Sequence, residues 1–280
     1  MTPRIAFWGT PELTTVYLDA HKASGLSPVV IITNPDRPKG RGHELTPPPA
    51  KVWALAHNVP VLQPEKLDDT FFDTLSSYNL DVSVVVAYGS IIPERFITLP
   101  KHATLNVHYS LLPKYRGASP TEAAILNGDT QTGCAIQIMR PALDSGPIIA
   151  SVTTDIGHDE ATPELRARLT ELGASLIVWA LPDYLAGKLD AIEQDHSLAT
   201  RCGKIKKEDA LIDITGDAAT NYRKYRAYKE WPRTYFMHEG KRLIITKAHM
   251  ENGVFVVDTV LPEGKKEVSY QDFLRSHPAH

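Results

Sequence analysis

The sequence predicts an α/β protein in which a mostly parallel sheet, covered by helices on both faces, precedes a small β-domain. The first observation is that short apolar runs alternate with helix-like segments over the first part of the chain. Such alternation is typical of a doubly wound parallel sheet. The second observation is that short strand-like runs separated by turns replace this alternation after residue 204. The length of 280 residues allows one large domain or two ordinary ones.

Apolar, β-branched runs predict the strands of the sheet. The clearest run is 81–87, which is rich in valine and is closed by Tyr88 and Gly89. Short runs of this kind are typical of parallel strands that are buried on both faces. The expected strands are 4–8, 29–32, 81–87, 103–108 and 133–139.

Helix-like segments separate and follow these strands. The last of them contains Thr162-Pro163-Glu164, a capping residue followed by proline, which is a helix start signal. Gly9-Thr10-Pro11, after the first strand, predicts a tight turn into the first helix. The expected helices are 12–23, 50–57, 68–77, 121–127 and 159–185.

The helical and strand periodicity weakens after Gly187 and changes after Gly203. We therefore expect a first domain over 1–187, a linker over 188–203 and a second domain over 204–280. A short helix over 217–228 is followed by strand-like runs with Gly-containing turns between them, which favours a small antiparallel β-domain. These runs are 233–237, 242–249 and 254–260.

The composition argues against several classes of protein. Hydrophobic residues at 42% and charged residues at 22% are typical of a globular protein rather than a disordered one. No stretch approaches the roughly twenty apolar residues that span a bilayer. The first residues lack the layout of a signal or transit peptide. With only Cys134 and Cys202, a cysteine framework is not expected, and we predict a reducing, cytoplasmic location.

Several catalytic motifs are missing. Gly9-Thr10-Pro11 is not a dinucleotide-binding fingerprint, and there is no Walker A sequence and no Gly-x-Ser-x-Gly elbow. His102 and His108 are six residues apart, and no His or Cys pair has the spacing of a zinc site. The sequence therefore argues against dinucleotide, ATP and activated-serine chemistry, and predicts no metal.

The charge is unevenly distributed. The whole chain carries 30 Lys+Arg and 33 Asp+Glu, a net charge of −3. Residues 201–250 hold 12 basic and 6 acidic residues, whereas the rest of the chain holds 18 and 27. A basic segment on an acidic body indicates an anionic partner, although a solvated basic surface would show the same composition.

Asn106 and His108 lie two residues apart at the end of an expected strand. Side chains alternate along a strand, so both point to the same side, and ligands gather at the carboxyl ends of parallel strands. An amide and an imidazole there could stabilise an oxyanion and move a proton. Asp144, in a turn after another strand, could orient the imidazole or hold a water. Three residues with purely structural roles would show the same spacing.

These residues also resemble a known family. Asn106-x-His108, Ser110-Leu111-Leu112-Pro113, Arg116-Gly117 and Asp144 are similar to the signature of the formyltransferases that use 10-formyltetrahydrofolate. The resemblance implies a doubly wound catalytic domain followed by a smaller OB-like barrel. With 77 residues from Lys204 to His280, we expect this barrel to be shortened by about two strands relative to the family.

The resemblance also implies roles for single residues. Asn106 and His108 would stabilise the oxyanion, and Asp144 would act on His108 and assist proton transfer through water. The formyl donor 10-formyltetrahydrofolate would be the co-substrate, with no metal. Its pocket would be lined by two loops and a far wall, comprising Tyr88, Gly89, Ser90, Ile91, Ile92, Ser110, Leu111, Leu112, Pro113, Arg140 and Leu143.

Further segments are similar to those family members that formylate methionyl-tRNA. They are 34–42, 60–64, 204–208 and 261–266. The resemblance implies formyl transfer to the α-amine of methionyl initiator tRNA at the start of protein biosynthesis, by a cytoplasmic enzyme that we expect to be a monomer. Prolines and glycines around residue 40 oppose helix, so we expect an exposed irregular loop there. The residues expected to contact tRNA are Arg37, Lys39, Arg41, Lys204, Lys206 and Lys207.

Two other functions are compatible with the sequence. The first is a formyltransferase of the same family that acts on a sugar nucleotide or another small amine. The second is a non-catalytic module that binds tRNA or folate. Tyr222, Tyr225 and Tyr228 could stack on bases, but their helical spacing favours packing inside the second domain.

Overall fold

The computed structural model describes residues 2–39 and 44–277 of the chain. The chain forms two compact units, between which it passes more than once. Unit 1 comprises Met1–Arg116, Gly133–Thr153 and Ala167–Arg201. Unit 2 comprises Gly117–Thr132, Thr154–Arg166 and Cys202–His280.

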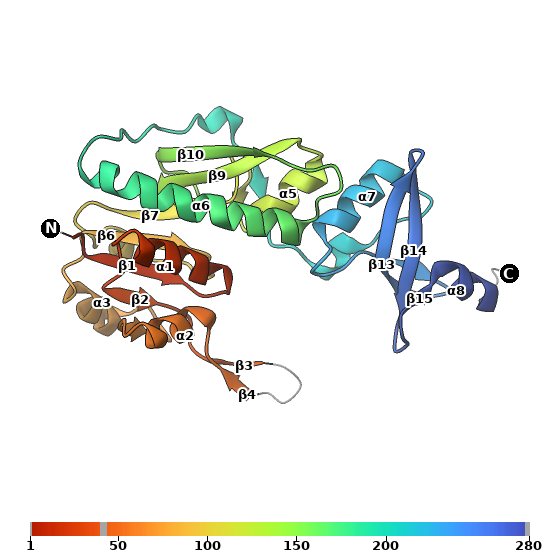
Figure 1. Cartoon of the computed structure of the whole chain (residues 1–280), viewed down its shortest axis with the longest axis horizontal. Coiled ribbons are helices and arrows are strands. Elements are labelled where there is room, and N and C mark those ends of the chain that lie inside the picture. Colours follow the sequence, from red (N-terminus) through yellow and green to blue (C-terminus); the bar gives the residue numbers. More distant parts are fainter. Residues whose placement is uncertain (1, 40–43, 278–280) are drawn as a thin grey trace. The chain divides into compact units, whose positions relative to one another are not determined.

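A seven-stranded sheet forms the centre of unit 1 (Figure 1). Its strands are β1 (Ile5–Gly9), β2 (Val30–Ile32), β5 (Val61–Leu62), β6 (Val82–Val86), β7 (Ala103–His108), β9 (Gln131–Ile138) and β10 (Ile148–Asp155). Their order in the sheet is β10-β9-β7-β6-β1-β2-β5. The strands from β7 to β5 are parallel, and β9 runs antiparallel to β7. The predicted mostly parallel sheet is confirmed.

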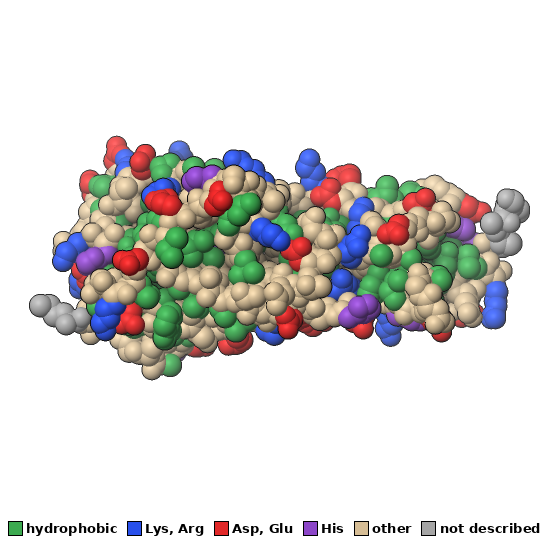
Figure 2. Space-filling model, turned by 90° about the horizontal axis from the view of Figure 1, so that it is seen from above, with side chains coloured by type: hydrophobic (Ala, Val, Ile, Leu, Met, Phe, Trp, Pro, Cys, Tyr) green, Lys and Arg blue, Asp and Glu red, His purple; other side chains and the backbone are tan. Residues whose placement is uncertain are grey.

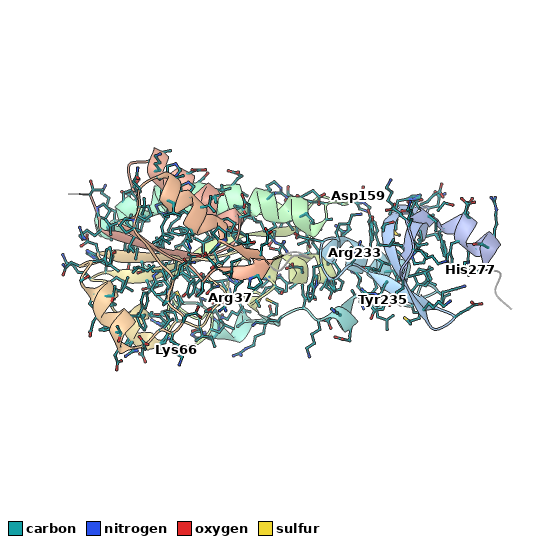
Figure 3. All side chains as sticks on the ribbon, turned by 90° about the horizontal axis from the view of Figure 1, so that it is seen from below. Arg37, Lys66, Asp159, Arg233, Tyr235 and His277 are labelled. Carbon is teal, nitrogen blue, oxygen red and sulfur yellow. The ribbon has the colours of Figure 1, made fainter. Side chains whose placement is uncertain are left out.

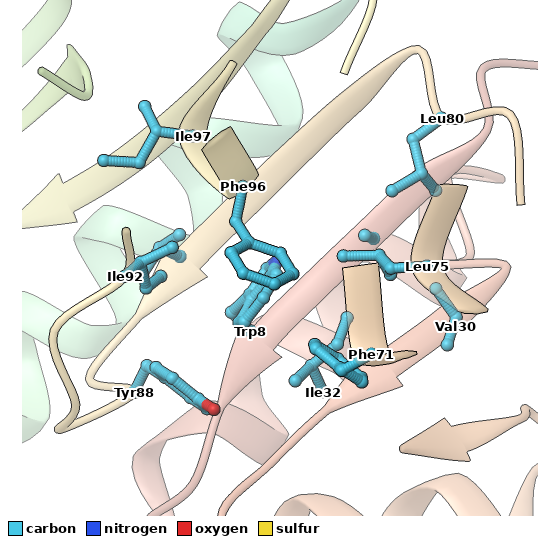
Figure 4. Packing of buried hydrophobic residues seen from close by; sticks show 12 residues of the cluster. Trp8, Val30, Ile32, Phe71, Leu75, Leu80, Tyr88, Ile92, Phe96 and Ile97 are labelled. Carbon is cyan, nitrogen blue, oxygen red and sulfur yellow. The ribbon is translucent and has the colours of Figure 1, made fainter. Parts of the chain in front are cut away.

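Helices cover both faces of this sheet. They are α1 (Leu13–Ala23), α2 (Pro49–Ala56), α3 (Asp69–Ser76), α4 (Glu94–Ile97) and α6 (Thr162–Leu185). Neighbouring residues of β1 point to opposite faces. Phe7 packs edge-on against His21 of α1, with ring centroids 5.9 Å apart. Trp8 packs against Phe71 of α3 and Phe96 of α4, and Figure 4 shows the buried cluster around it.

The turn after β1 depends on glycine. A Cβ at Gly9 would lie 2.7 Å from the Cγ2 of Thr14 and 2.9 Å from the carbonyl oxygen of Val86. Any larger residue would push β1 away from β6 or from the start of α1. The predicted tight turn is therefore a packing requirement of the sheet, and no phosphate-binding role is needed to explain the glycine.

Unit 2 contains an antiparallel sheet. Its strands are β12 (Tyr235–His238), β13 (Lys241–Glu251), β14 (Val254–Pro262) and β15 (Val268–Ser269). Its helices are α5 (Pro120–Asn127), α7 (Ala218–Ala227) and α8 (Tyr270–Ser276). Tyr222 and Tyr225 of α7 are buried against this sheet beside Phe255. The C-terminal sheet confirms the predicted small β-domain, and packing, rather than exposure for stacking, accounts for these two tyrosines.

Short elements complete the chain. Two helical turns of the 3-10 type, η1 and η2, lie in the second half, and two further pairs of strands form small ribbons. These elements are β3 (Arg37–Lys39) paired with β4 (Glu44–Thr46), β8 (Arg116–Gly117) paired with β11 (Arg201–Cys202), η1 (His196–Leu198) and η2 (Lys207–Ala210).

The structure corrects the predicted irregular loop near residue 40. Arg37–Lys39 and Glu44–Thr46 are the arms of an antiparallel hairpin in which Pro38 lies opposite Leu45. Proline is tolerated there because a two-stranded ribbon leaves one edge unpaired, so the missing N–H removes no obligatory bond. The intervening residues 40–43, including Arg41, lie outside the described residues.

The sequence did not predict β5 and β10. β5 has only two residues, which is too short for a recognisable pattern. In β10 exposed residues alternate with partly or fully buried ones, so the strand lacks the continuous apolar run of its neighbours. The long helix begins at Thr162 rather than at residue 159 and continues through Pro182 to Leu185.

The surface mixes charges of both signs. On the face shown in Figure 2, acidic and basic side chains alternate and do not gather into a single field. No helix in the described part of the chain is long and apolar enough to cross a membrane.

Candidate active site

The end of β7 brings together the residues that the sequence singled out. Asn106 and His108 lie on this strand, between parallel β6 and antiparallel β9. Asn106 is partly exposed, whereas His108 is 6% exposed. The strand register therefore presents an amide and a nearly buried imidazole side by side on one face, as the alternation predicted.

His108 is held by two partners. Its Nε2 lies 2.8 Å from the carbonyl oxygen of Tyr115. A carbonyl can only accept, so Nε2 carries the proton and Nδ1 is the atom that can take up another. Nδ1 lies 3.8 Å from Oδ2 of Asp144. The predicted pairing of the imidazole with this carboxylate is thus present in the geometry, at a distance that is longer than a direct hydrogen bond.

Both partners of His108 have an unusual backbone conformation. Asp144 has φ of +48° and Tyr115 has φ of +57°, in the left-handed region that residues other than glycine rarely adopt. Such conformations persist only where surrounding contacts hold them, and they are common at functional sites. The surrounding structure therefore holds the backbone in an energetically unfavourable conformation at Tyr115 and Asp144, the two residues beside the imidazole.

Gln137 is a site residue that the sequence did not reveal. It is 1% exposed, lies opposite Asn106 in the β7–β9 register, and donates from Nε2 to Oδ1 of Asp144 at 2.8 Å. Its Oε1 is buried and has no hydrogen-bond partner among the described residues. Only the pairing of β9 with β7 places this amide, so no spacing in the sequence could have found it.

The segment 88–92, predicted to line a folate pocket, follows β6. The carbonyl oxygen of Tyr88 accepts from Nδ2 of Asn34 at 2.9 Å, and Ser90 Oγ donates to Asn34 Oδ1 at 3.2 Å. Burial raises the pKa of Tyr88 to about 12, so its hydroxyl stays protonated. Ile92 is buried, whereas Ile91 is 92% exposed. Gly89 is exposed and has a positive φ.

The other predicted folate residues lie after β7 and β9. Ser110 is buried and donates from Oγ to the carbonyl oxygen of Lys114 at 2.6 Å. Leu112 is buried, and Leu111 and Pro113 are partly exposed. After β9, Leu143 is 65% exposed. Arg140 donates to both carboxylate oxygens of Glu193, at 3.0 and 2.5 Å.

The predicted tRNA contacts are mostly exposed cations. Arg37, labelled in Figure 3, has 71% of its side chain exposed and lies 3.7 Å from Glu65. Lys39 belongs to β3. Lys204, Lys206 and Lys207 are exposed. Arg37 and Lys39 belong to unit 1, whereas the three lysines belong to unit 2. Neither unit alone therefore contains all of these cations.

No group of three or more metal-ligating side chains lies together among residues 2–39 and 44–277. The chemistry available at the end of β7 is that of an amide, an imidazole and a carboxylate. Such a set can stabilise negative charge on oxygen and move a proton.

The chain matches known proteins over most of its length. Residues 3–181 match the family described as Formyl transferase, and residues 204–255 match Formyl transferase, C-terminal domain. The chain is 43% identical over 261 residues to "Methionyl-tRNA formyltransferase" of Chloroflexus aurantiacus. That alignment covers 92% of this chain and 84% of the relative.

Two solved structures share the fold. Methionyl-tRNA formyltransferase from Clostridium thermocellum has a TM-score of 0.63 at 18% identity, covering 93% of this chain and 98% of that chain. HypX from Aquifex aeolicus in complex with tetrahydrofolic acid has a TM-score of 0.69 at 15% identity. The match covers 98% of this chain and 47% of HypX.

Proposed function

Because the chain belongs to the formyl transferase family and is a formyl-transferring enzyme, we propose that it formylates the α-amine of methionyl initiator tRNA, with 10-formyltetrahydrofolate as the donor. The observation that carries the chemistry is the cluster of Asn106, His108 and Asp144 at the end of β7. The choice of methionyl-tRNA as the acceptor is supported by the relative with 43% identity, whose name is methionyl-tRNA formyltransferase.

The reaction needs a stabilised oxyanion and a route for a proton. Attack of the neutral amine on the formyl carbon forms a C–N bond, and it places negative charge on oxygen and positive charge on nitrogen. The amide of Asn106 can donate to that oxygen, and a protonated His108 adds positive charge beside it. The C–N bond to the donor then breaks, and the proton lost by the attacking amine is delivered to the leaving nitrogen.

The geometry of His108 assigns atoms to these steps. Its Nε2–H is used by the carbonyl oxygen of Tyr115, so Nδ1 is the atom that gains and loses a proton. Asp144 faces that atom and stabilises the imidazolium. The 3.8 Å separation is just longer than a direct hydrogen bond, and we propose that a water beside the two atoms completes the proton relay. Gln137 holds the second carboxylate oxygen and so fixes the direction of the first.

Two exposed side chains support a folate-type donor. Ile91 and Leu143 offer apolar surface for a flat ring system. We propose that the loops 88–92 and 110–113, with Arg140 and Leu143, hold the donor.

The remaining expectations concern the rest of the molecule. We propose that 1–187 carries catalysis, that 188–203 links the two functions, and that 204–280 contacts tRNA through a shortened OB-like domain. Arg37, Lys39, Arg41, Lys204, Lys206 and Lys207 are the proposed cationic contacts. We further propose that the enzyme is a cytoplasmic monomer.

The test is a formylation assay on the full chain with 10-formyltetrahydrofolate. Methionyl initiator tRNA is compared with methionyl elongator tRNA and with amino-sugar nucleotides. We expect rapid formylation of the initiator species only. Turnover of an amino-sugar nucleotide without turnover of tRNA would identify a small-amine formyltransferase. Binding of tRNA and folate without any turnover would identify a binding module.

A further inference from the structure

A hollow of about 700 Å³ opens in unit 1 next to the candidate active site. Its lining includes three arginines and one histidine, Arg116, Arg140, His196 and Arg201, together with Ser145, the neighbour of Asp144. None of the described residues that line it is acidic. A concave surface with this composition attracts an anion.

The cations are fixed in position to different degrees. Arg116 is 7% exposed, and its Nε and Nη2 donate to Oε1 of Gln194 at 3.1 and 2.6 Å. Its Nη2 also donates to Nδ1 of His196 at 2.9 Å, which leaves Nε2 of that ring as an N–H donor. Arg201 is exposed. Arg140 is paired with Glu193 and Arg116 is bound to Gln194 and His196, so the exposed His196 and Arg201 are the groups that an anion would meet first.

A buried glutamine connects the hollow to the reacting groups. Gln194 is 6% exposed and accepts from Arg116 through Oε1. Its Nε2 donates to the carbonyl oxygens of Asp144 and Gly146, at 3.0 and 2.7 Å. The residue before Arg116, Tyr115, holds His108. An anion in the hollow would therefore be anchored to the same framework that orients the imidazole and the carboxylate.

We propose that this hollow binds a backbone phosphate of the 3′-terminal nucleotides of the acceptor RNA and thereby positions the aminoacyl ester at His108. This inference rests on the proposed function. Arginine binds phosphate through forked hydrogen bonds, and the exposed guanidinium of Arg201 is accessible to such a contact, with the buried Arg116 adding positive charge behind it. The volume suits a nucleotide unit rather than a single carboxylate group. Of the residues proposed to hold the folate donor only Arg140 also lines the hollow, and it is paired with Glu193, so loss of Arg201 should leave binding of the donor unchanged.

Arg201→Ala tests the proposal, since its exposed side chain can be removed without disturbing the core. We expect the KM for methionyl-tRNA to rise about tenfold while the KM for the folate donor stays constant. The slope of log affinity against log salt for RNA should fall by about one, the contribution of one phosphate contact. Lys188→Ala is the matched control, because it removes one exposed cation of unit 1 outside the hollow, and it should change neither value.

Two further measurements separate the alternatives. Formylation of methionyl-adenosine, which has no phosphodiester, should be equally fast in wild type and Arg201→Ala. Arg201→Lys, which keeps the charge but not the fork, should raise the KM for methionyl-tRNA less than Arg201→Ala does. A raised KM for the folate donor with an unchanged KM for tRNA would overturn the proposal in favour of a carboxylate site for the donor.

The proposal can fail independently of the proposed function. Equal effects of Arg201→Ala and Lys188→Ala on tRNA, in an enzyme whose wild type formylates methionyl-tRNA, would refute the phosphate site alone. A wild type that does not formylate methionyl-tRNA would refute the proposed function. In that case binding of a short RNA ending in CCA, measured by fluorescence with and without Arg201→Ala, still decides whether the hollow takes a phosphate.

Discussion

The groups around the end of β7 and the exposed cations of the hairpin and of 204–207 are held in opposite ways. His108 is nearly buried and contacts both a backbone carbonyl and a carboxylate. Arg37 has 71% of its side chain exposed and lies 3.7 Å from one glutamate. Bond-making chemistry requires fixed atoms in a dry setting, whereas a polyanion can be held by mobile charges in water. Changes in the first region should therefore lower kcat, and changes in the second should raise KM and alter its salt dependence.

The largest expected effect is at the end of β7. His108→Ala or Asn106→Ala should lower kcat by about 10²–10³, equivalent to about 3–4 kcal/mol, because each removes a group that stabilises charge in the transition state. Binding of folate and tRNA, measured by fluorescence titration, should be nearly unchanged. His102→Ala, an exposed histidine six residues away, is the control and should keep full activity. A near-wild-type rate in either variant would disprove the assignment.

The next prediction compares His108 with another buried histidine, His21, and tests whether burial alone is enough to make a histidine catalytic. His21 is fully buried against Phe7, and burial lowers its pKa from 6.5 to about 4. Between pH 4 and pH 6.5, His21 binds a proton in the unfolded chain but not in the folded chain. The contribution of neutral His21 to the free energy of unfolding is therefore fully present above about pH 6.5. It is lost, by up to about 3 kcal/mol, as the pH falls towards 4.

His21→Leu should remove this contribution without affecting catalysis. Urea denaturation of wild type and variant at pH 7 and at pH 4.5 measures it, and the difference between the two proteins cancels the other titrating groups. An unchanged pH dependence, or a loss of kcat in the variant, would contradict the distinction between a buried structural histidine and a buried reacting one.

A smaller effect is expected at Gln137. Gln137→Met keeps the size of the side chain but removes the donor to Asp144, so the carboxylate can rotate away from His108. We expect kcat to fall about tenfold with both KM values unchanged. Gln131→Met is a matched control, because Gln131 also lies on β9 and donates to an aspartate, Asp155, at 2.9 Å. Equal behaviour of the two variants would show that the bond to Asp144 has no role in positioning.

The smallest effects are expected for the exposed cations. Arg37→Ala and Lys206→Ala should each raise the KM for methionyl-tRNA about two- to fivefold, since one exposed ionic contact is worth about 1 kcal/mol or less. The effect should shrink as salt is added. Lys66, an exposed lysine of unit 1 labelled in Figure 3, provides the control Lys66→Ala. Equal effects on tRNA and folate would argue against RNA contact by these cations.

Much of the fold could be predicted because its signals are local. Alternating apolar runs and helices predicted the sheet, and the strand 103–108 was predicted with the bounds that the structure gives. β10 was missed because it lacks a continuous apolar run, and the hairpin near residue 40 was missed because Pro38 argues against a strand.

In unit 2 the charge of the cations on α7 did not show whether they bind a partner or support the fold. Arg226 is 9% exposed and donates to the carbonyl oxygens of Gly157 and Glu160, so it supports the fold instead of facing a partner.

For the candidate site the division is similar. The sequence by itself determined which residue types are present and that Asn106 and His108 share a face, because period-two alternation along a strand is a local property. Only the tertiary structure decided the rest. Pairing of β9 with β7 brings Gln137 opposite Asn106, and the return of the chain after β9 brings Asp144 to His108. The hollow joins residues 116, 140, 196 and 201 in the same way. These approaches depend on strand order and register, which result from long-range packing and leave no spacing in the sequence to read.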